Sequence, residues 1–221
     1  MKLLAQAAFK FLLGVGLCWL LLFVPAGGLH YPNAWLFSGL LFLPMLGVGL
    51  VLWKKAPDLL RKRLNTREKA GTQKRVVLAS ALLFAVGFAV AGLDFRFGWS
   101  SLPPWVTPAA SVVFLLAYAM YAEVLRENAY LSRTVELQES QKLVDSGLYA
   151  VVRHPMYAAA FLLFLSMPLV LGSVWAVAVF LPVPLLLAAR IRDEEALLLE
   201  GLAGYREYTQ RVRFRMIPFI W

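Results

Sequence analysis

Residues 156–189 read "MYAAAFLLFLSMPLVLGSVWAVAVFLPVPLLLAA", a long run without a single charged side chain. One straight helix of this length would measure about 51 Å, whereas the hydrocarbon core of a bilayer is about 30 Å thick. Gly172 and Ser173 lie near the middle of the run, shortly after Pro168. The run therefore predicts a membrane hairpin of two helical arms, with Pro182 and Pro184 kinking the second arm.

Four further apolar segments precede this hairpin, at residues 7–24, 34–53, 76–93 and 105–125. Each is close to the roughly 20 residues that a membrane-spanning helix needs. The chain of 221 residues is 61% hydrophobic and 16% charged, whereas soluble domains carry about 25% charged residues. We therefore expect an all-α polytopic membrane protein with about six transmembrane segments, the last two forming the hairpin. Residues 1–125 would form a four-span bundle, and residues 126–221 a second functional region.

Basic residues alternate between the loops that join these segments. Residues 54–75 contain nine lysines and arginines, residues 25–33 contain none, and residues 94–104 contain one. Because lysine and arginine collect in cytoplasmic loops, this pattern predicts a multi-pass integral membrane protein with both termini in the cytoplasm. The polar stretch 126–153 and the tail after Arg190 would face the same side. Topology and contact with lipid headgroups thus account for the net charge of +9, and we do not expect nucleic acid as a partner.

Metal and phosphate chemistry find little support in the sequence. His30 and His154 are the only histidines and fall on opposite predicted sides of the membrane, so we expect no metal site. Cys18, the only cysteine, lies inside an apolar segment. The sequence "GVGL" occurs at residues 14–17 and 47–50, but both copies lie within predicted spans. We therefore interpret them as sites of close helix packing rather than as phosphate-binding loops.

Arg153, His154 and Pro155 stand directly before the hairpin. Proline is favoured in the first turn of a helix, which places His154 at or near the N-cap. The backbone N–H groups of such a helix start attract a carboxylate or a phosphate. Arg153 can equally be a topology signal beside an ordinary helix start, and this stretch alone leaves both interpretations open.

A second polar group follows the hairpin. Arg190 and Glu194 are four residues apart and share a helix face, whereas Glu195 points about 100° away from that face. An exposed ion pair here would contribute only about 0.5 kcal/mol. Because the hairpin returns to its starting side, it brings this group close to Arg153 and His154. The apolar pattern of the tail predicts that it folds back along the membrane surface.

These residues together resemble a known family. The similarity lies in four features: the sequence "GLYAVVRHPMY" at 147–157, the hairpin, the two glutamates after Arg190, and "GYREYTQRVRFRMIP" at 204–218. In these features the chain is similar to the integral-membrane methyltransferases of the isoprenylcysteine carboxyl methyltransferase group. Related phospholipid methyltransferases share the arrangement. The resemblance covers residues 126–221 and implies S-adenosylmethionine as methyl donor, in a pocket that a cytoplasmic C-terminal tail closes. It also implies a lipophilic small-molecule or lipidated acceptor that enters sideways from the lipid.

The resemblance also implies individual roles. Cofactor-binding positions would be Gln141, Lys142, Leu143, Val144, Tyr149, His154, Pro155, Met156, Tyr157 and Glu194. Glu194 would take the cofactor's amine or its ribose hydroxyls, and Tyr149 and Tyr157 would offer aromatic faces. Arg190 would orient the acceptor. A carboxylate acceptor needs no general base, whereas an amine or a thiol would be helped by one, and Glu195 is then the nearest candidate.

Two other classes of protein remain open. An NADPH-dependent membrane reductase of the sterol type would need a basic subsite for the 2′-phosphate, for which Lys62 and Arg63 are the nearest candidates. A non-enzymatic membrane component would bind no nucleotide and would leave Arg190 and Glu194 without a role. The sequence determines neither the acceptor nor the oligomeric state.

Overall fold

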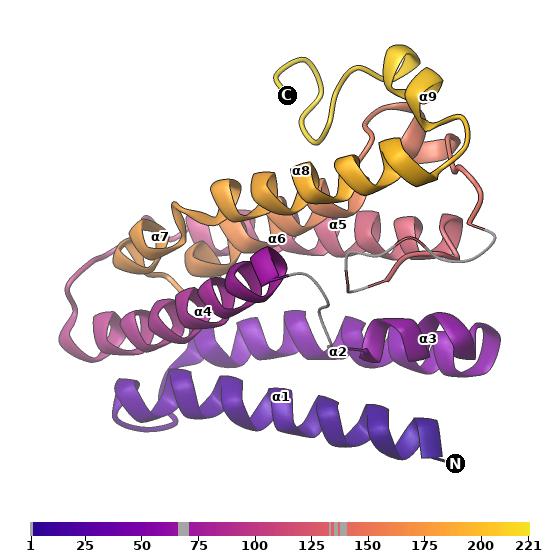
Figure 1. Ribbon diagram of the computed structural model, residues 1–221. Helices are drawn as coiled ribbons and strands as arrows, with labels where there is room; N and C mark the ends of the chain where they lie inside the picture. The colour runs from indigo at the N-terminus through magenta and orange to yellow at the C-terminus, as the bar shows by residue number, and fades with distance from the viewer. Residues whose placement is uncertain (1, 66–70, 133, 135–136, 138–140) are drawn as a thin grey trace.

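The computed structural model describes residues 2–65, 71–132, 134, 137 and 141–221, with the backbone alone at residues 71 and 72. Over these residues the chain is helical and contains no strand (Figure 1). The elements are α1 (Lys2–Ala26), α2 (Pro32–Lys55), α3 (Pro57–Leu64), α4 (Gly71–Phe97), α5 (Val106–Glu127), the 3₁₀ turn η1 (Gly147–Ala150), α6 (Pro155–Val170), α7 (Val174–Phe180), α8 (Val183–Gly201) and α9 (Tyr205–Arg211). Arg67, Lys69 and Arg133, which contribute to the predicted charge pattern, lie outside the described residues.

By length and composition, five segments of the described chain can cross a membrane: α1, α2, α4, α5 and the combined α7–α8 segment. The all-α polytopic prediction is confirmed. The sixth predicted segment, α6, is apolar but has 16 residues, so it is about 24 Å long. It is therefore a short first arm of the hairpin. The described part of the predicted loop 54–75 is largely helical, because it contains the end of α2, all of α3 and the beginning of α4.

The hairpin turns where the sequence predicts. Gly172 has φ +78°, a conformation that residues with a Cβ rarely adopt, and the turn ends when the Ser173 hydroxyl accepts a hydrogen bond from the backbone N–H of Ala176 (3.0 Å). The second arm is interrupted between α7 and α8 at Leu181 and Pro182. The predicted proline kink is therefore confirmed.

Three short connections meet at the end of the bundle that carries this turn. The Tyr31 hydroxyl donates to the carbonyl of Leu171 (2.6 Å), and the Ser173 hydroxyl donates to Asp94 Oδ2 (2.5 Å). Asp94 is almost fully buried and also accepts from the backbone N–H of Ser100 (2.8 Å). These bonds fix the returning arm relative to α4, and therefore fix where α8 ends at the opposite side of the bundle.

Close helix packing occurs at glycines other than those expected. A Cβ on Gly92 of α4 would lie 2.5 Å from the carbonyl oxygen of Leu22 in α1, and a Cβ on Gly87 would overlap the Phe180 ring of α7. The glycines of the two "GVGL" segments have no described atom within 4 Å of the corresponding position. The expectation of close packing at residues 14–17 and 47–50 is therefore wrong, because those faces of α1 and α2 are open.

We predict that Gly92→Ala destabilises the protein by about 1–3 kcal/mol, since the neighbouring backbone of α1 must move away to admit a methyl group. Gly16→Ala on α1 is the matched control, because it meets open space and alanine is the better helix former. The melting temperatures of both variants can be measured by thermal unfolding in detergent. Equal melting temperatures for the two variants would contradict the tight α1–α4 contact.

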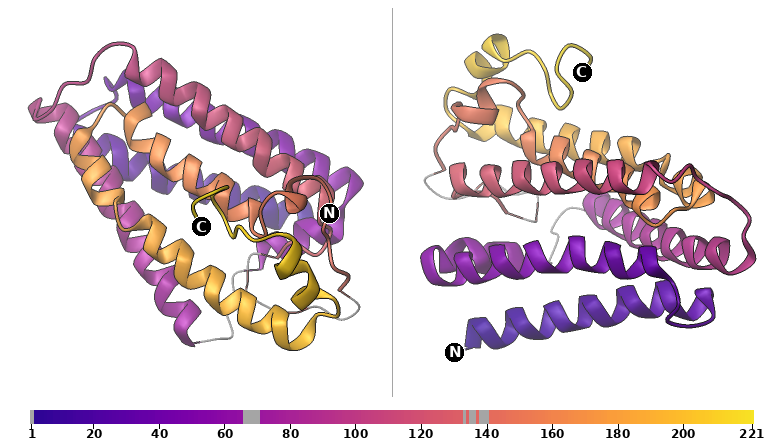
Figure 2. Two further views of the ribbon diagram at one scale, coloured as in Figure 1. Left: turned by 90° about the horizontal axis from the view of Figure 1, so that it is seen from above. Right: turned by 180° about the vertical axis from the view of Figure 1, so that it is seen from behind.

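Most of the polar segments of the chain lie at the opposite end of the bundle. The N-terminus, α3, η1 and α9 all lie there, on the right of Figure 1, and the C-terminal tail lies over the start of α6, beside α8 (Figure 2). The largest cluster of buried apolar residues includes Phe37 and Phe114 as well as Tyr157, Ile191 and Met216. One continuous core thus joins residues 1–125 to residues 126–221, and the division into two regions stays a functional prediction.

Candidate active site

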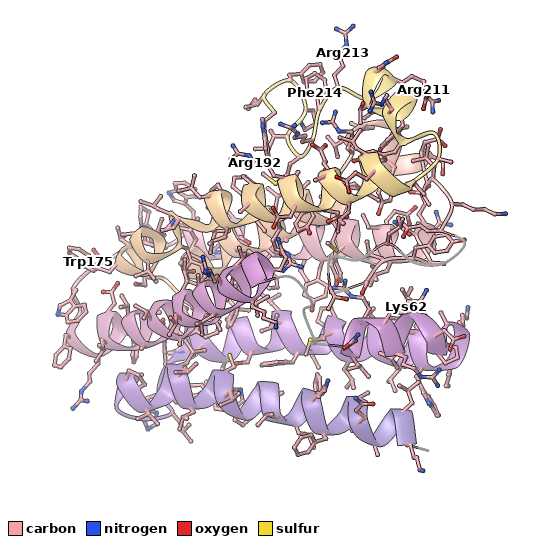
Figure 3. The ribbon with its side chains drawn as sticks, viewed as in Figure 1. Lys62, Trp175, Arg192, Arg211, Arg213 and Phe214 are labelled. Atoms are coloured by element: carbon pink, nitrogen blue, oxygen red, sulfur yellow. The ribbon has the colours of Figure 1, made fainter. Side chains whose placement is uncertain are left out.

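The start of α6 is bonded to the C-terminal tail. His154 is the N-cap of α6 and Pro155 occupies the first helical position, as the sequence predicts. The backbone N–H of Arg153 donates to the carbonyl of Phe214 (2.9 Å), and that of His154 donates to the carbonyl of Arg215 (2.8 Å). The tail therefore covers the helix start, while Arg213 and Phe214 lie on its outer side (Figure 3).

This arrangement changes the expected role of the helix start. The His154 N–H is already used by the tail, Pro155 has no N–H, and the N–H groups of Tyr157 and Ala158 both donate to the carbonyl of His154. A ligand carboxylate would find few donors here. The expectation that this helix start accepts a carboxylate is therefore not supported by the backbone hydrogen bonds.

Arg153 is buried, with a relative exposure of 9%. Its Nε donates to Glu195 Oε1 (2.7 Å), and its Nη1 donates to the carbonyls of Val212 (2.8 Å) and Arg213 (2.9 Å). A buried guanidinium needs such partners, and here they come from α8 and from the tail. Arg153 thus holds three segments together, and the interpretation as a mere topology signal is wrong.

Glu195 is the centre of this buried ionic cluster. Its Oε1 accepts from Arg153 and lies 3.4 Å from His154 Nε2, and its Oε2 accepts from Arg215 Nε (2.7 Å). Both carboxylate oxygens are therefore committed to cations. A general base must present an oxygen to the substrate proton, so the geometry argues against the base role considered for Glu195.

The preceding residue, Glu194, faces the other way. Its Oε2 accepts from the Tyr157 hydroxyl (2.7 Å), and Arg190 interacts with the same hydroxyl from one turn earlier in α8. Tyr157 stands on α6, so this group connects the two arms of the hairpin. The predicted proximity of the hairpin's two ends is thus observed, with Tyr157 as the contact residue on α6.

Two neighbouring cavities flank this contact. The first, called here the tyrosine-lined cavity, encloses about 520 Å³ counted with its open mouth. All ten predicted cofactor-binding residues line it: Gln141, Lys142, Leu143, Val144, Tyr149, His154, Pro155, Met156, Tyr157 and Glu194. The second, the Arg190 cavity, contains Arg190 and shares the walls formed by Met156, Tyr157 and Glu194. A molecule in one cavity can therefore approach a molecule in the other.

Several lining residues were not predicted from the sequence. They are Asn128, Leu131, Arg153, Leu198, Leu202, Tyr205 and Tyr208. Asn128 ends α5 and its Nδ2 donates to the Tyr149 hydroxyl (2.8 Å), while the Tyr208 hydroxyl donates to the Tyr149 carbonyl (2.7 Å). The spacing of Tyr205 and Tyr208 within "GYREY" places both on one face of a helix, and this signal could have identified them.

Tyr205 has a feature that points to a ligand. Its residue is 3% exposed, yet its hydroxyl has no hydrogen-bond partner among the described residues. Burial, with the nearby carboxylates of Glu195 and Glu194, raises the pKa of Tyr205 well above its usual value, so the hydroxyl stays protonated. Because an unpaired buried hydroxyl is costly, a bound molecule in the tyrosine-lined cavity would relieve that cost.

The fold and these cavities define an all-helical membrane protein with a buried polar site at one end of its bundle. Residues 109–200 match the model of the isoprenylcysteine carboxyl methyltransferase (ICMT) family. The resemblance predicted for residues 126–221 is therefore confirmed over residues 126–200, and the matched segment contains α6, α7 and nearly all of α5 and α8. A search of curated proteins gives no match to the chain. Within the described residues, no cluster of His, Cys, Asp and Glu could hold a metal ion.

Proposed function

We propose that the protein transfers a methyl group from S-adenosylmethionine to the carboxylate of a lipidic acceptor. The match of residues 109–200 to a methyltransferase family supports methyl transfer in general. The choice of cofactor and acceptor is supported by one observation: the ten expected cofactor-binding residues line one cavity beside Arg190.

The tyrosine-lined cavity suits the parts of the cofactor. Lys142 is exposed at the cavity and offers a cation to the cofactor's carboxylate, for which the helix start of α6 has few free donors. A carboxylate offers several lone-pair sites, so Glu194 can accept from the cofactor's amine while it holds Tyr157. The hydroxyl of Tyr205 donates to a ribose or carboxylate oxygen. Tyr149 and Tyr157 provide aromatic faces, which attract cationic groups.

The protein's own side chains would then have few roles in the reaction. When bound, S-adenosylmethionine supplies a methyl group on a positively charged sulfur, which keeps the bond's electron pair as an acceptor oxygen takes the methyl. Arg190 holds the acceptor carboxylate by paired hydrogen bonds in the adjoining cavity. A carboxylate is already ionised at neutral pH, so no proton needs to be removed. The full commitment of Glu195 to cations fits a reaction that proceeds without a general base.

We further propose that the site faces the cytoplasm. No lysine or arginine occurs in the connections at the opposite end of the bundle, which are residues 27–31, 98–105 and 171–173. Residues 54–63, in contrast, contain five. The positive-inside rule assigns the basic end to the cytoplasm. Membrane lipids surround the spans, and the acceptor reaches the site from them.

Calorimetric titration of the detergent-purified protein with S-adenosylmethionine tests cofactor use, with NADPH as the rival ligand. We expect saturable binding of S-adenosylmethionine and none of NADPH. The reverse result would favour the reductase class, and binding of neither would favour a non-enzymatic membrane protein.

Tyr205→Phe should weaken S-adenosylmethionine binding about tenfold and leave the melting temperature unchanged or slightly higher, because the lost hydroxyl has no described partner to leave unpaired. Tyr208→Phe is the matched variant on the same helix. Its hydroxyl donates to the Tyr149 carbonyl, so its loss should cost about 1 kcal/mol of stability. Calorimetry and thermal unfolding of both variants separate the two roles. A loss of stability in Tyr205→Phe with unchanged binding would count against a ligand contact at this hydroxyl.

A further inference from the structure

A large apolar groove lies between α1, α2 and α3, apart from the two site cavities. It encloses about 1190 Å³ counted with its open side, more than twice the volume of the tyrosine-lined cavity. Its walls include Phe11 of α1, Trp53 of α2 and Leu60 of α3, and Lys10 and Arg63 are the charged side chains among its described lining residues. An apolar groove of this size with two cations fits a hydrocarbon chain that ends in an anionic group.

Arg63 separates this groove from the active-site cavities. Its Nη1 donates to the carbonyl of Ser132 (3.0 Å) and lies 3.7 Å from the sulfur of Met156, while its Nη2 donates to the hydroxyl of Tyr121. Ser132 lines the Arg190 cavity, and Met156 lines both cavities. Arg63 is therefore the side chain that lies between the groove and the candidate site, with its guanidinium against residues of the Arg190 cavity.

Lys10 is the second cation of the groove. It lies within the apolar helix α1, and its Nζ donates to the carbonyl of Leu64 (2.5 Å), the last residue of α3. A lysine within a membrane-spanning helix is costly and commonly serves a function. Through this bond Lys10 also fixes the end of α3 beside the groove, so both cations lie where α1 meets α3.

We propose that this groove binds the hydrocarbon chain of the methyl acceptor, a lipid whose chain ends in a carboxylate, and that Arg63 guides the carboxylate toward Arg190. This inference rests on the proposed function. The lining residues of α1 run from Leu4 to Leu12, about 12 Å of helix axis, which suits one extended chain. Arg63 and Arg190 would then form a cationic path from the membrane to the site, complementary to one anionic head.

The inference can be tested with palmitate that carries a photoreactive diazirine in its chain, added to the detergent-purified protein. We expect crosslinks on the groove-lining faces of α1, α2 and α3, mapped by mass spectrometry. Unlabelled palmitate should compete, and phosphatidylcholine should not. Crosslinks spread evenly over the apolar surface, or equal competition by phosphatidylcholine, would overturn the proposal in favour of a general lipid contact.

Gly49→Phe places a ring in the groove, and no described atom lies within 4 Å of the new Cβ, so the helix can accept it. We expect labelling to fall at least tenfold. Gly47→Phe is the control, because Gly47 has equally open surroundings on the same helix but does not line the groove. Equal labelling of the two variants would contradict the assignment.

Arg63→Gln should weaken palmitate binding about tenfold and keep the crosslinks in the groove, since it removes the charge and leaves the apolar walls. S-adenosylmethionine titration of Gly49→Phe distinguishes the two proposals, because its cofactor affinity should equal that of the unmodified protein. Absence of cofactor binding in the unmodified protein would remove the proposed function even where the groove is labelled. Unchanged palmitate affinity in Arg63→Gln would overturn its guiding role.

Discussion

Glu195→Ala is expected to loosen the C-terminal tail and to lower the stability of the protein by about 3–5 kcal/mol. The substitution leaves the buried guanidinium of Arg153 without its carboxylate, and it also removes the partner of Arg215. Breaking a buried ion pair by removing one partner is costly because the remaining charge stays unsolvated. The melting temperature should fall on the order of 10 °C. Trypsin should cleave the tail, for example after Arg213, at a higher rate.

Glu200→Ala on the exposed surface of α8 is the matched control and should change neither quantity. The two interpretations of Glu195 predict different outcomes. A Glu195→Ala protein that keeps its melting temperature and tryptic pattern but loses turnover would show that this carboxylate acts in the reaction and not in the tail's attachment.

Arg190→Gln is expected to reduce carboxyl methylation about 100-fold or more while the affinity for S-adenosylmethionine stays within about twofold. Arg190 lines the cavity in which we propose that the acceptor binds, so its loss would remove the paired hydrogen bonds proposed to orient the carboxylate. The rate can be measured as transfer of a radiolabelled methyl group into a membrane lipid extract. Methyl esters release volatile methanol on treatment with base, which separates them from methylated amines and thiols.

Arg192→Gln is the control for this variant, since Arg192 lies two residues along α8 with its side chain exposed and directed outward (Figure 3). Arg190→Lys should recover little activity, because an ammonium group cannot make the paired contact. A large loss of cofactor affinity in Arg190→Gln would instead assign Arg190 to the tyrosine-lined cavity.

The sequence predicts the hairpin well because its determinants are local. Gly172 allows a backbone conformation that other residues avoid, and Pro182 interrupts the second arm at a fixed position. Apolar run lengths likewise place the ends of the first four spans to within five residues. The resemblance to a known family then selects ten residues that the fold brings to one cavity.

The ionic cluster was harder to predict because it depends on contacts between distant segments. Helical periodicity separates the faces of Glu194 and Glu195, but it does not say that the tail returns over the second of them. The hairpin brings Arg153 within 2.7 Å of Glu195, 42 positions away, and the returning tail adds the carbonyls of Val212 and Arg213 to the same guanidinium. The shared helix face of Tyr205 and Tyr208 could be predicted from their spacing, but the cavity that this face lines depends on the same long-range return. The wrong expectation for the "GVGL" glycines arose because small residues permit close packing without requiring it.

Methyl transfer to a lipid carboxylate can be measured by incubating the purified protein with methyl-labelled S-adenosylmethionine and a membrane lipid extract, then collecting the volatile label that base releases. We expect label in base-labile esters of the lipid fraction, formed in proportion to the amount of protein. Label recovered only in base-stable products, or no transfer despite saturable cofactor binding, would contradict methylation of a lipid carboxylate at this site.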